Sequence, residues 1–96
     1  MIQLEKTDEY HDWFNGLTDR VVKARIEARV RRLGEGNAGD AVPVGEGVSE
    51  LRLHFGSGWR VYYTERCGMI ILLLVGGKKS TQNRDIKLAL DLARNL

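Results

Sequence analysis

The sequence predicts a small α+β protein, in which an N-terminal strand and a helical hairpin pack on a mainly antiparallel sheet of about four strands, followed by a C-terminal helix. Two stretches of alternating apolar and polar residues, 50–55 and 59–64, have the period of half-buried strands. Three further stretches, 7–16, 18–33 and 80–96, carry apolar residues at helical spacing.

Length and composition indicate one globular domain, residues 1–96. Hydrophobic residues make up 43% of the chain and charged residues 29%, and the longest apolar run, 69–75, is too short for a membrane span. The N-terminus lacks the features of a secretory signal, and the single Cys67 cannot form an internal disulfide. With two histidines and one cysteine we expect no metal site and no cofactor, and the default location is the cytoplasm.

Charge is unevenly distributed along the chain, although the net charge is only +2. Residues 20–34 hold six basic groups and one acidic group, whereas residues 35–50 hold four acidic groups and no basic one. This separation indicates an anionic partner for the basic segment, such as nucleic acid or the ribosome. A solvated helix surface gives the same pattern, so both interpretations stay open.

The N-terminal region predicts a short strand and a short helix. Ile2 and Leu4 alternate with polar residues, and Thr7 is a suitable N-cap for a helix that stops near Gly16. The apolar residues of this helix have the spacing of a core-facing stripe: Tyr10, Trp13, Phe14 and Leu17. We interpret these residues as core.

A second helix follows after a very short connection, with Thr18 as its predicted cap and Leu33 as its last residue. Its apolar stripe consists of Val22, Ile26, Val30 and Leu33. Arg25, Arg29 and Arg32 lie on one flank, which either binds RNA phosphates or is a solvated surface whose side-chain stems shield apolar neighbours. The two helices should form an αα-hairpin over the apolar face of the sheet.

The alternating stretches predict a β-hairpin with two different faces. If residues 56–58 form the loop, Phe55 faces Trp59 and Arg52 faces Tyr62. One face of the hairpin is then apolar. The other, polar face carries Glu50, Arg52, His54, Arg60, Tyr62 and Thr64.

Two stretches lack strand alternation. Residues 34–48 are glycine-rich and form either a mobile loop or an extended lead-in to the hairpin, whereas residues 69–75 are continuously apolar, as in a central strand buried on both faces. Ser80 then predicts the cap of a final helix that runs to Leu96. The stripe of that helix consists of Ile86, Ala89, Leu90, Ala93 and Leu96, widened by Leu88 and Leu92.

The polar face of the hairpin suits phosphate chemistry. Arg52 and Arg60 project from the same face, and a guanidinium fork matches the geometry of phosphate oxygens. A more ordinary interpretation is that these arginines form exposed ion pairs with Glu50 and Asp85, which contribute little to stability.

The proton acceptor of such a site stays open between three side chains. Lys78 and Lys79 leave the central strand just before a helix N-terminus, and either lysine is a candidate base. His54 is the alternative base. Tyr62 is expected to hold or protonate an oxygen, and Gln82, in the first turn of the last helix, is expected to reach the same pocket.

Two stretches resemble the RelE/HigB toxin superfamily: residues 49–63, with Glu-Leu-Arg-Leu-His-Phe-Gly-Ser-Gly-Trp-Arg, and residues 72–82, with Gly-Gly-Lys-Lys-Ser. Within the superfamily the chain is most similar to the phage-derived "addiction module killer" branch, whose members have a similar Gly-Gly-x-Lys-Ser-x-Gln ending and a terminal helix. The resemblance covers nearly the whole chain and implies the same small α+β fold.

Membership would imply a toxin of a type II toxin–antitoxin pair. Such toxins enter the ribosomal A site and cleave translated mRNA without a metal, so the implied activity is that of an endoribonuclease that blocks translation. The implied partners are the ribosome, its mRNA and a cognate helix-turn-helix antitoxin. By resemblance, Arg52 and Arg60 match the basic sheet positions of the family, and Lys79 is a better counterpart of its lysine than Lys78.

The resemblance leaves two alternatives to a ribonuclease. The chain lacks the C-terminal tail with histidine or tyrosine that several ribonucleases of the superfamily use. ParE-type relatives share the fold but inhibit DNA gyrase. A non-catalytic, antitoxin-binding module is the other alternative, because a fold does not determine a function.

Overall fold

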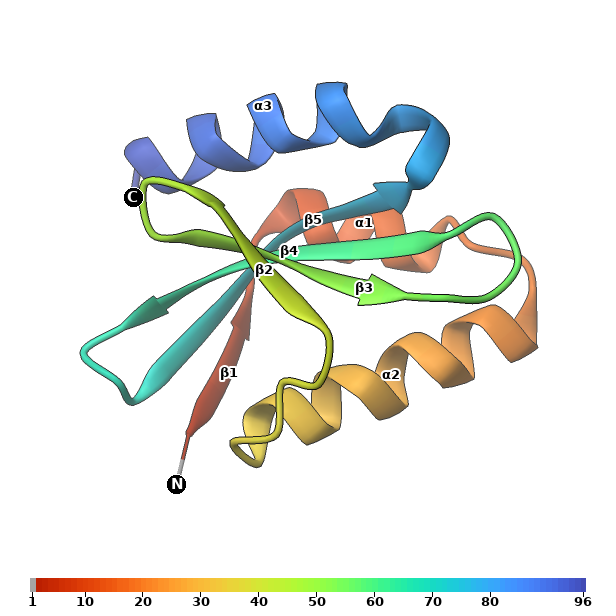
Figure 1. The fold of residues 1–96 in the computed structure, drawn as a ribbon, viewed down its shortest axis with the longest axis horizontal. Coiled ribbons are helices and arrows are strands. Elements are labelled where there is room, and N and C mark those ends of the chain that lie inside the picture. The colour runs from red at the N-terminus through yellow and green to blue at the C-terminus, as the bar shows by residue number, and fades with distance from the viewer. Residues whose placement is uncertain (1) are drawn as a thin grey trace.

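The computed structural model describes residues 2–96 and contains a five-stranded sheet with three α-helices (Figure 1). The strands are ordered β1-β5-β4-β3-β2, with β1 parallel to β5 and the other neighbours antiparallel. In chain order the elements are β1 (Gln3–Lys6), α1 (Asp8–Asn15), α2 (Arg20–Gly34), β2 (Ala41–Gly45), β3 (Val48–Leu53), β4 (Trp59–Arg66), β5 (Ile70–Lys78), the 3-10 turn η1 (Lys79–Thr81) and α3 (Gln82–Arg94). The predicted α+β fold is confirmed, and β2 shows that the glycine-rich connector is an extended lead-in to the hairpin.

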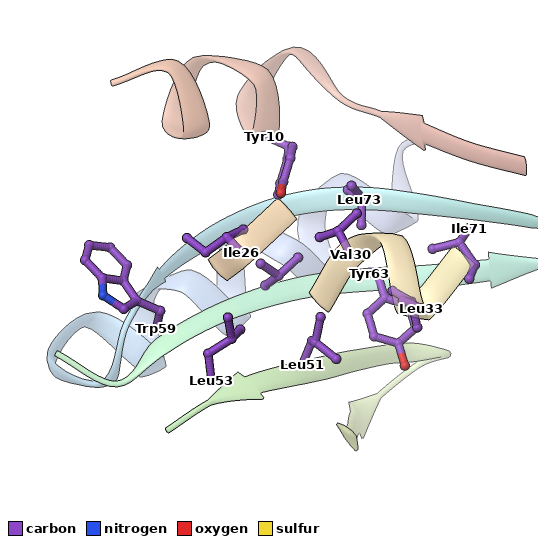
Figure 2. Close-up of a cluster of buried hydrophobic side chains, with 11 residues drawn as sticks. Tyr10, Ile26, Val30, Leu33, Leu51, Leu53, Trp59, Tyr63, Ile71 and Leu73 are labelled. Atoms are coloured by element: carbon purple, nitrogen blue, oxygen red, sulfur yellow. The ribbon is translucent and has the colours of Figure 1, made fainter. Parts of the chain in front are cut away.

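Helices cover both faces of the sheet. α1 and α2 pack on one face and α3 on the other, and Figure 1 shows α2 and α3 on opposite sides of the strands. Figure 2 shows the larger core cluster, on the α1/α2 face, which consists of Tyr10, Ile26, Val30, Leu33, Leu51, Leu53, Trp59, Val61, Tyr63, Ile71 and Leu73. The smaller cluster, on the α3 face, consists of Val48, Tyr62, Leu74, Val75 and Ala89. β5, an interior strand between β1 and β4, contributes to both clusters, as its unbroken apolar run predicted.

The predicted N-cap residue is correct for one helix and wrong for the other two. Thr7 caps α1 as predicted, because its hydroxyl accepts the N–H of Tyr10 at 3.0 Å. Asp19, not Thr18, caps α2, since its carboxylate accepts the N–H groups of the first helical turn. Ser80 is not a cap either, because it lies inside the 3-10 turn, and α3 begins only at Gln82.

The hairpin register differs from the predicted one by two residues. Leu53 pairs with Trp59 and Arg52 with Arg60, so the loop has five residues, 54–58, rather than three. Because the side-chain period of a strand is two, this shift leaves the residues that remain paired on their predicted faces, whereas His54 and Phe55 lie in the loop instead of the strand. The apolar and polar faces of the hairpin were therefore predicted correctly, but the cross-strand partners were wrong.

Two glycines of β5 allow both helices to approach the sheet closely. A Cβ atom at Gly76 would lie 2.2 Å from the indole ring of Trp13 in α1, and one at Gly77 would lie 1.9 Å from a carboxylate oxygen of Asp85 in α3. Neither position can carry a side chain without displacing its neighbour. The Gly-Gly pair therefore has a packing role, and β5 extends past its predicted end at Val75 to Lys78.

The apolar stripe of α3 is narrower than predicted. Ala89 is buried, and Ile86, Leu90, Leu92 and Ala93 pack around it. Leu88 and Leu96 are instead exposed, because Leu88 lies outside the contact with the sheet and Leu96 lies past the end of the helix. Within residues 2–96, no helix combines the length and the apolar character that crossing a membrane requires.

Candidate functional site

A buried carboxylate, Glu50, organises the polar face of the hairpin beneath the start of α3. Its side chain is fully buried and accepts three hydrogen bonds. Arg52 Nε donates to Oε1 at 2.9 Å, while the Tyr62 hydroxyl and Gln82 Nε2 donate to Oε2 at 2.9 and 2.8 Å. The interpretation of an exposed ion pair is therefore wrong for Glu50, since Gln82 and the rest of α3 cover it.

Burial and hydrogen bonding fix the protonation states in this network. Burial of the Glu50 carboxylate acts to raise its pKa, but the hydrogen bonds from Arg52, Gln82 and Tyr62 outweigh burial and hold the pKa below its ordinary value. Burial and the bond to Glu50 raise the pKa of Tyr62. Glu50 is thus an anion and Tyr62 a neutral donor.

Tyr62 does not occupy the position expected of it. Its side chain is fully buried, and its hydroxyl is directed at Glu50 rather than at an open surface. The expectation that Tyr62 holds or protonates a substrate oxygen is not supported by this placement. Its hydroxyl helps instead to satisfy the buried carboxylate.

Arg60 is a buried cation with buried N–H donors that have no hydrogen-bond partner among the described residues. It is 6% exposed, and its Nε lies 3.9 Å from Glu50 Oε2, beyond hydrogen-bond distance. Within residues 2–96, its Nε and Nη1 have no hydrogen-bond partner. An unsatisfied buried donor costs about 1–3 kcal/mol, and more when it is charged. Glu50 thus compensates the charge of Arg60, while the Nε and Nη1 donors of Arg60 remain without an acceptor in the described part of the chain.

Arg60 lines an open bay of about 740 Å³ at the hairpin loop. The bay is also lined by Arg52, His54, loop residues 56–58, Lys79 and Gln82. Three of these lining side chains, Arg52, Arg60 and Lys79, are cations, no carboxylate is among the lining residues that the structure describes, and Glu50 lies buried beneath Arg52. Such a surface favours an anionic group. Within residues 2–96, no three His, Cys, Asp or Glu side chains are grouped so that they could hold a metal ion.

The two candidate lysines lie on opposite sides of the hairpin loop. Lys79 lines the bay with Arg52 and Arg60. Lys78 points to the α1/α2 side, where its Nζ lies 5.6 Å from the ring centroid of Trp59 and lines a separate cleft. The structure therefore brings Lys79, and not Lys78, together with the arginines of β3 and β4.

His54 also reaches the bay, from a position that the predicted register did not give it. It is the first residue of the loop rather than a strand residue opposite Arg60. Its Nε2 is hydrogen-bonded to Oδ2 of Asp40, which immediately precedes β2. Sequence reasoning missed Asp40 because the pairing of β2 with β3, which brings the connector alongside the hairpin, was left open.

The three arginines of α2 have different surroundings. Arg29 is committed to the backbone, because its Nη1 donates to Arg52 O at 2.7 Å and its Nη2 to Ala38 O at 3.2 Å. The guanidinium of Arg25 stacks on Phe55, 4.7 Å from the ring centroid. Arg25 and Arg32 line a smaller hollow that shares His54 with the bay. α2 therefore extends the cationic surface around the rim.

The strand order, the helical hairpin on one face and α3 on the other define a protein of the RelE-like fold. A solved structure of the E. coli toxin RelE, a variant with two arginines changed to alanine in the free state, superposes with a TM-score of 0.74 at 13% identity, over 94% of this chain and 95% of that one. The predicted RelE-like fold is thereby confirmed. The closer likeness to the "addiction module killer" branch stays a prediction.

The chain is also 44% identical, over 95 residues, to an uncharacterized protein of Haemophilus influenzae. The alignment covers 99% of this chain and 96% of that protein. The chain therefore belongs to the same family as that protein. No family model matches the chain.

Proposed function

We propose that the chain is the toxin of a type II toxin–antitoxin pair and that it cleaves mRNA on the ribosome. The observation that carries this proposal is Arg60, a buried guanidinium with unused N–H donors at the wall of a cationic bay. A phosphate group supplies the oxygens that such donors lack. The RelE-like fold supports a toxin, since the solved neighbour of that fold is a toxin.

The bay suits stabilisation of a phosphodiester during cleavage. In the proposed reaction the ribose 2′-oxygen attacks the adjacent phosphorus and the 5′-oxygen leaves, so negative charge builds up on the non-bridging oxygens. Arg60 and Arg52 stabilise that charge from β4 and β3, and Lys79 lines the same bay. Because three side chains supply the positive charge, the step requires no metal.

Glu50 holds this group in place without touching the substrate. It fixes Arg52 and Gln82 by hydrogen bonds and lies behind Arg60. The side-chain amide of Gln82 donates a hydrogen bond to Glu50. This bond fixes the orientation of the amide, and Gln82 lines the bay. Preorganised donors of this kind act without the cost of reorganisation during the reaction.

Ribosomal RNA is the proposed docking partner of α2. Arg25 and Arg32 surround the hollow next to the bay, whereas Arg29 holds the backbone of β3 and the connector. We therefore expect Arg25 and Arg32 to contribute more to RNA binding than Arg29 does. The remaining proposed partner is a helix-turn-helix antitoxin, and the proposed location is the cytoplasm, where ribosomes and mRNA are found.

The substitution Arg60→Lys tests the proposal, because it keeps the charge and removes the guanidinium fork. We expect single-turnover cleavage of mRNA on purified ribosomes to slow by roughly 10²–10³-fold. The matched control is Arg84→Lys, at an exposed arginine of α3 that does not line the bay. Cleavage by Arg60→Lys at the parental rate would contradict the assignment.

Mapping of mRNA 5′ ends after induced expression distinguishes the competing functions. Cuts in phase with codons would support the ribosome-dependent ribonuclease. Relaxed plasmid DNA with intact mRNA would support a gyrase inhibitor instead. Normal growth with intact mRNA and plasmid would support a non-catalytic antitoxin-binding module.

A further inference from the structure

We infer that His54 is the proton acceptor of the cleavage reaction and that Asp40 is the residue that positions it, an inference that rests on the proposed ribonuclease function. His54 shares the bay with Arg52, Arg60 and Lys79. It therefore lines the same bay as the groups that would hold the phosphate. Histidine is the side chain most often used for proton transfer near neutral pH.

The position of Asp40 is fixed by the backbone rather than by His54. Its carbonyl oxygen accepts the N–H of Arg52 at 2.9 Å, which joins the start of β2 to β3. Arg29 Nη2 donates to the same carbonyl oxygen at 3.5 Å. The carboxylate of Asp40 thus projects from an anchored residue and constrains the otherwise exposed imidazole of His54.

The hydrogen bond between the two side chains determines which nitrogen of His54 accepts a proton. The bond from His54 is the largest influence on Asp40 and holds the pKa of its carboxyl below the ordinary value. An ionised carboxylate only accepts hydrogen bonds, so Nε2 of His54 carries the proton. In the neutral imidazole Nδ1 then carries the lone pair, as in catalytic pairs in which a carboxylate orients a histidine.

The proton balance of the reaction follows from this tautomer. His54 Nδ1 takes the proton of the ribose 2′-hydroxyl while the bond from O2′ to phosphorus forms. The bond from phosphorus to O5′ breaks, and the leaving oxygen takes a proton from Lys79 or water. The products are a 2′,3′-cyclic phosphate and a 5′-hydroxyl. The imidazolium then returns its proton to solvent, and this replaces the proton that Lys79 or water gave to the leaving oxygen.

The imidazole of His54 is surrounded by charges of both signs. Asp40 is the carboxylate in contact with it. The cations that line the same two hollows come from four elements and are Arg25, Arg29 and Arg32 of α2, Arg52 of β3, Arg60 of β4 and Lys79 of η1. Asp40 therefore counteracts a cationic environment and stabilises the imidazolium that forms during the reaction.

Three variants test the inference on ribosome-bound mRNA across a pH series. We expect His54→Ala to slow cleavage by roughly 10²-fold or more and to regain rate when free imidazole is added. We expect Asp40→Asn to slow cleavage less and to move the acid limb of the pH–rate profile to lower pH, because the carboxylate that stabilises the imidazolium is gone. The matched control is His11→Ala, at the exposed histidine of α1, with the parental rate and profile.

The outcomes separate this inference from the function on which it rests. If the parental protein cleaves mRNA and His54→Ala cleaves at the same rate, the inference is wrong and the ribonuclease function stands. An unchanged acid limb in Asp40→Asn overturns the role of Asp40. If the parental protein cleaves no mRNA at any pH, the proposed function fails, and the inference fails with it.

Discussion

Beneath α1 and α2 the sheet presents an apolar surface, whereas beneath α3 the same strands present apolar and charged side chains together. On the first face, Leu51, Leu53 and Val61 are at most 2% exposed and require nothing but close packing. On the second face, Glu50 and Arg60 of the same two strands are also buried. The first face therefore accounts for most of the hydrophobic stabilisation, and the second holds charged groups in fixed positions.

The α3 face also changes in character along its length. At the far end of the hairpin, Val48 packs in the smaller apolar cluster. Two residues on, Glu50 is buried in its hydrogen-bonded network, and two further on, Arg52 is about one-third exposed at the bay. A charge buried in this way requires a complete set of partners. The apolar end of the face anchors α3, and the anchored helix in turn supplies Gln82 to that set.

Removal of the buried carboxylate should produce the largest difference between the two faces. Glu50→Ala would leave Tyr62 and Gln82 without their acceptor and Arg60 without its counter-charge, and we expect it to lower the free energy of unfolding by about 3–5 kcal/mol. Urea denaturation measures this loss. The matched variant Glu50→Gln keeps an acceptor oxygen and should lose less. Equal losses for the two variants would show that the negative charge of Glu50 matters and that its volume and acceptor oxygens do not.

Alanine at each glycine of β5 compares how the two faces tolerate an added methyl group. Gly76→Ala would push against the indole ring of Trp13, and Gly77→Ala against the carboxylate of Asp85. We expect each to lower the free energy of unfolding by about 1–3 kcal/mol through overpacking. Gly76→Ala should cost more, because a ring packed between a helix and the sheet moves less easily than the end of an aspartate. A milder effect for Gly76→Ala would contradict the tighter packing of the α1/α2 face.

The two faces also differ in what the sequence could predict about them. Alternation in the two hairpin strands assigned each residue to its face. It could not fix the register, because loops of three and five residues place the same side chains on the same faces. The apolar stripe of α3 indicated a contact with the sheet, but not that this contact would cover the polar face and bury Glu50.

Burial is what separates the predicted site from the observed one. The position of Glu50 two residues before Arg52, on the same strand face, was a readable signal that the two side chains are neighbours. Nothing in the local sequence indicated that Tyr62 would be directed at that carboxylate instead of at a substrate. The position of Asp40 beside His54 depends on the pairing of β2 with β3. That pairing is a long-range contact, and it leaves no periodic signal in a glycine-rich connector.

The smallest predicted effect concerns the decrease in the free energy of unfolding at acid pH. Of the two faces of the sheet, the charged face should contribute to this decrease and the apolar face should not. Because hydrogen bonds hold the pKa of Glu50 below its ordinary value in the folded protein, the unfolded chain binds more protons as the pH falls below about 4.3, and stability decreases in that window. We expect Glu50→Gln to flatten this decrease in urea titrations at successive pH values. The control is Glu46→Gln, at an exposed carboxylate whose pKa is lowered by Arg94 and whose loss should flatten the curve less. An acid limb that stays parallel in Glu50→Gln and the parental protein would mean that the pKa of Glu50 is the same in the folded and the unfolded chain, so that its hydrogen bonds do not favour the charged carboxylate over the neutral one.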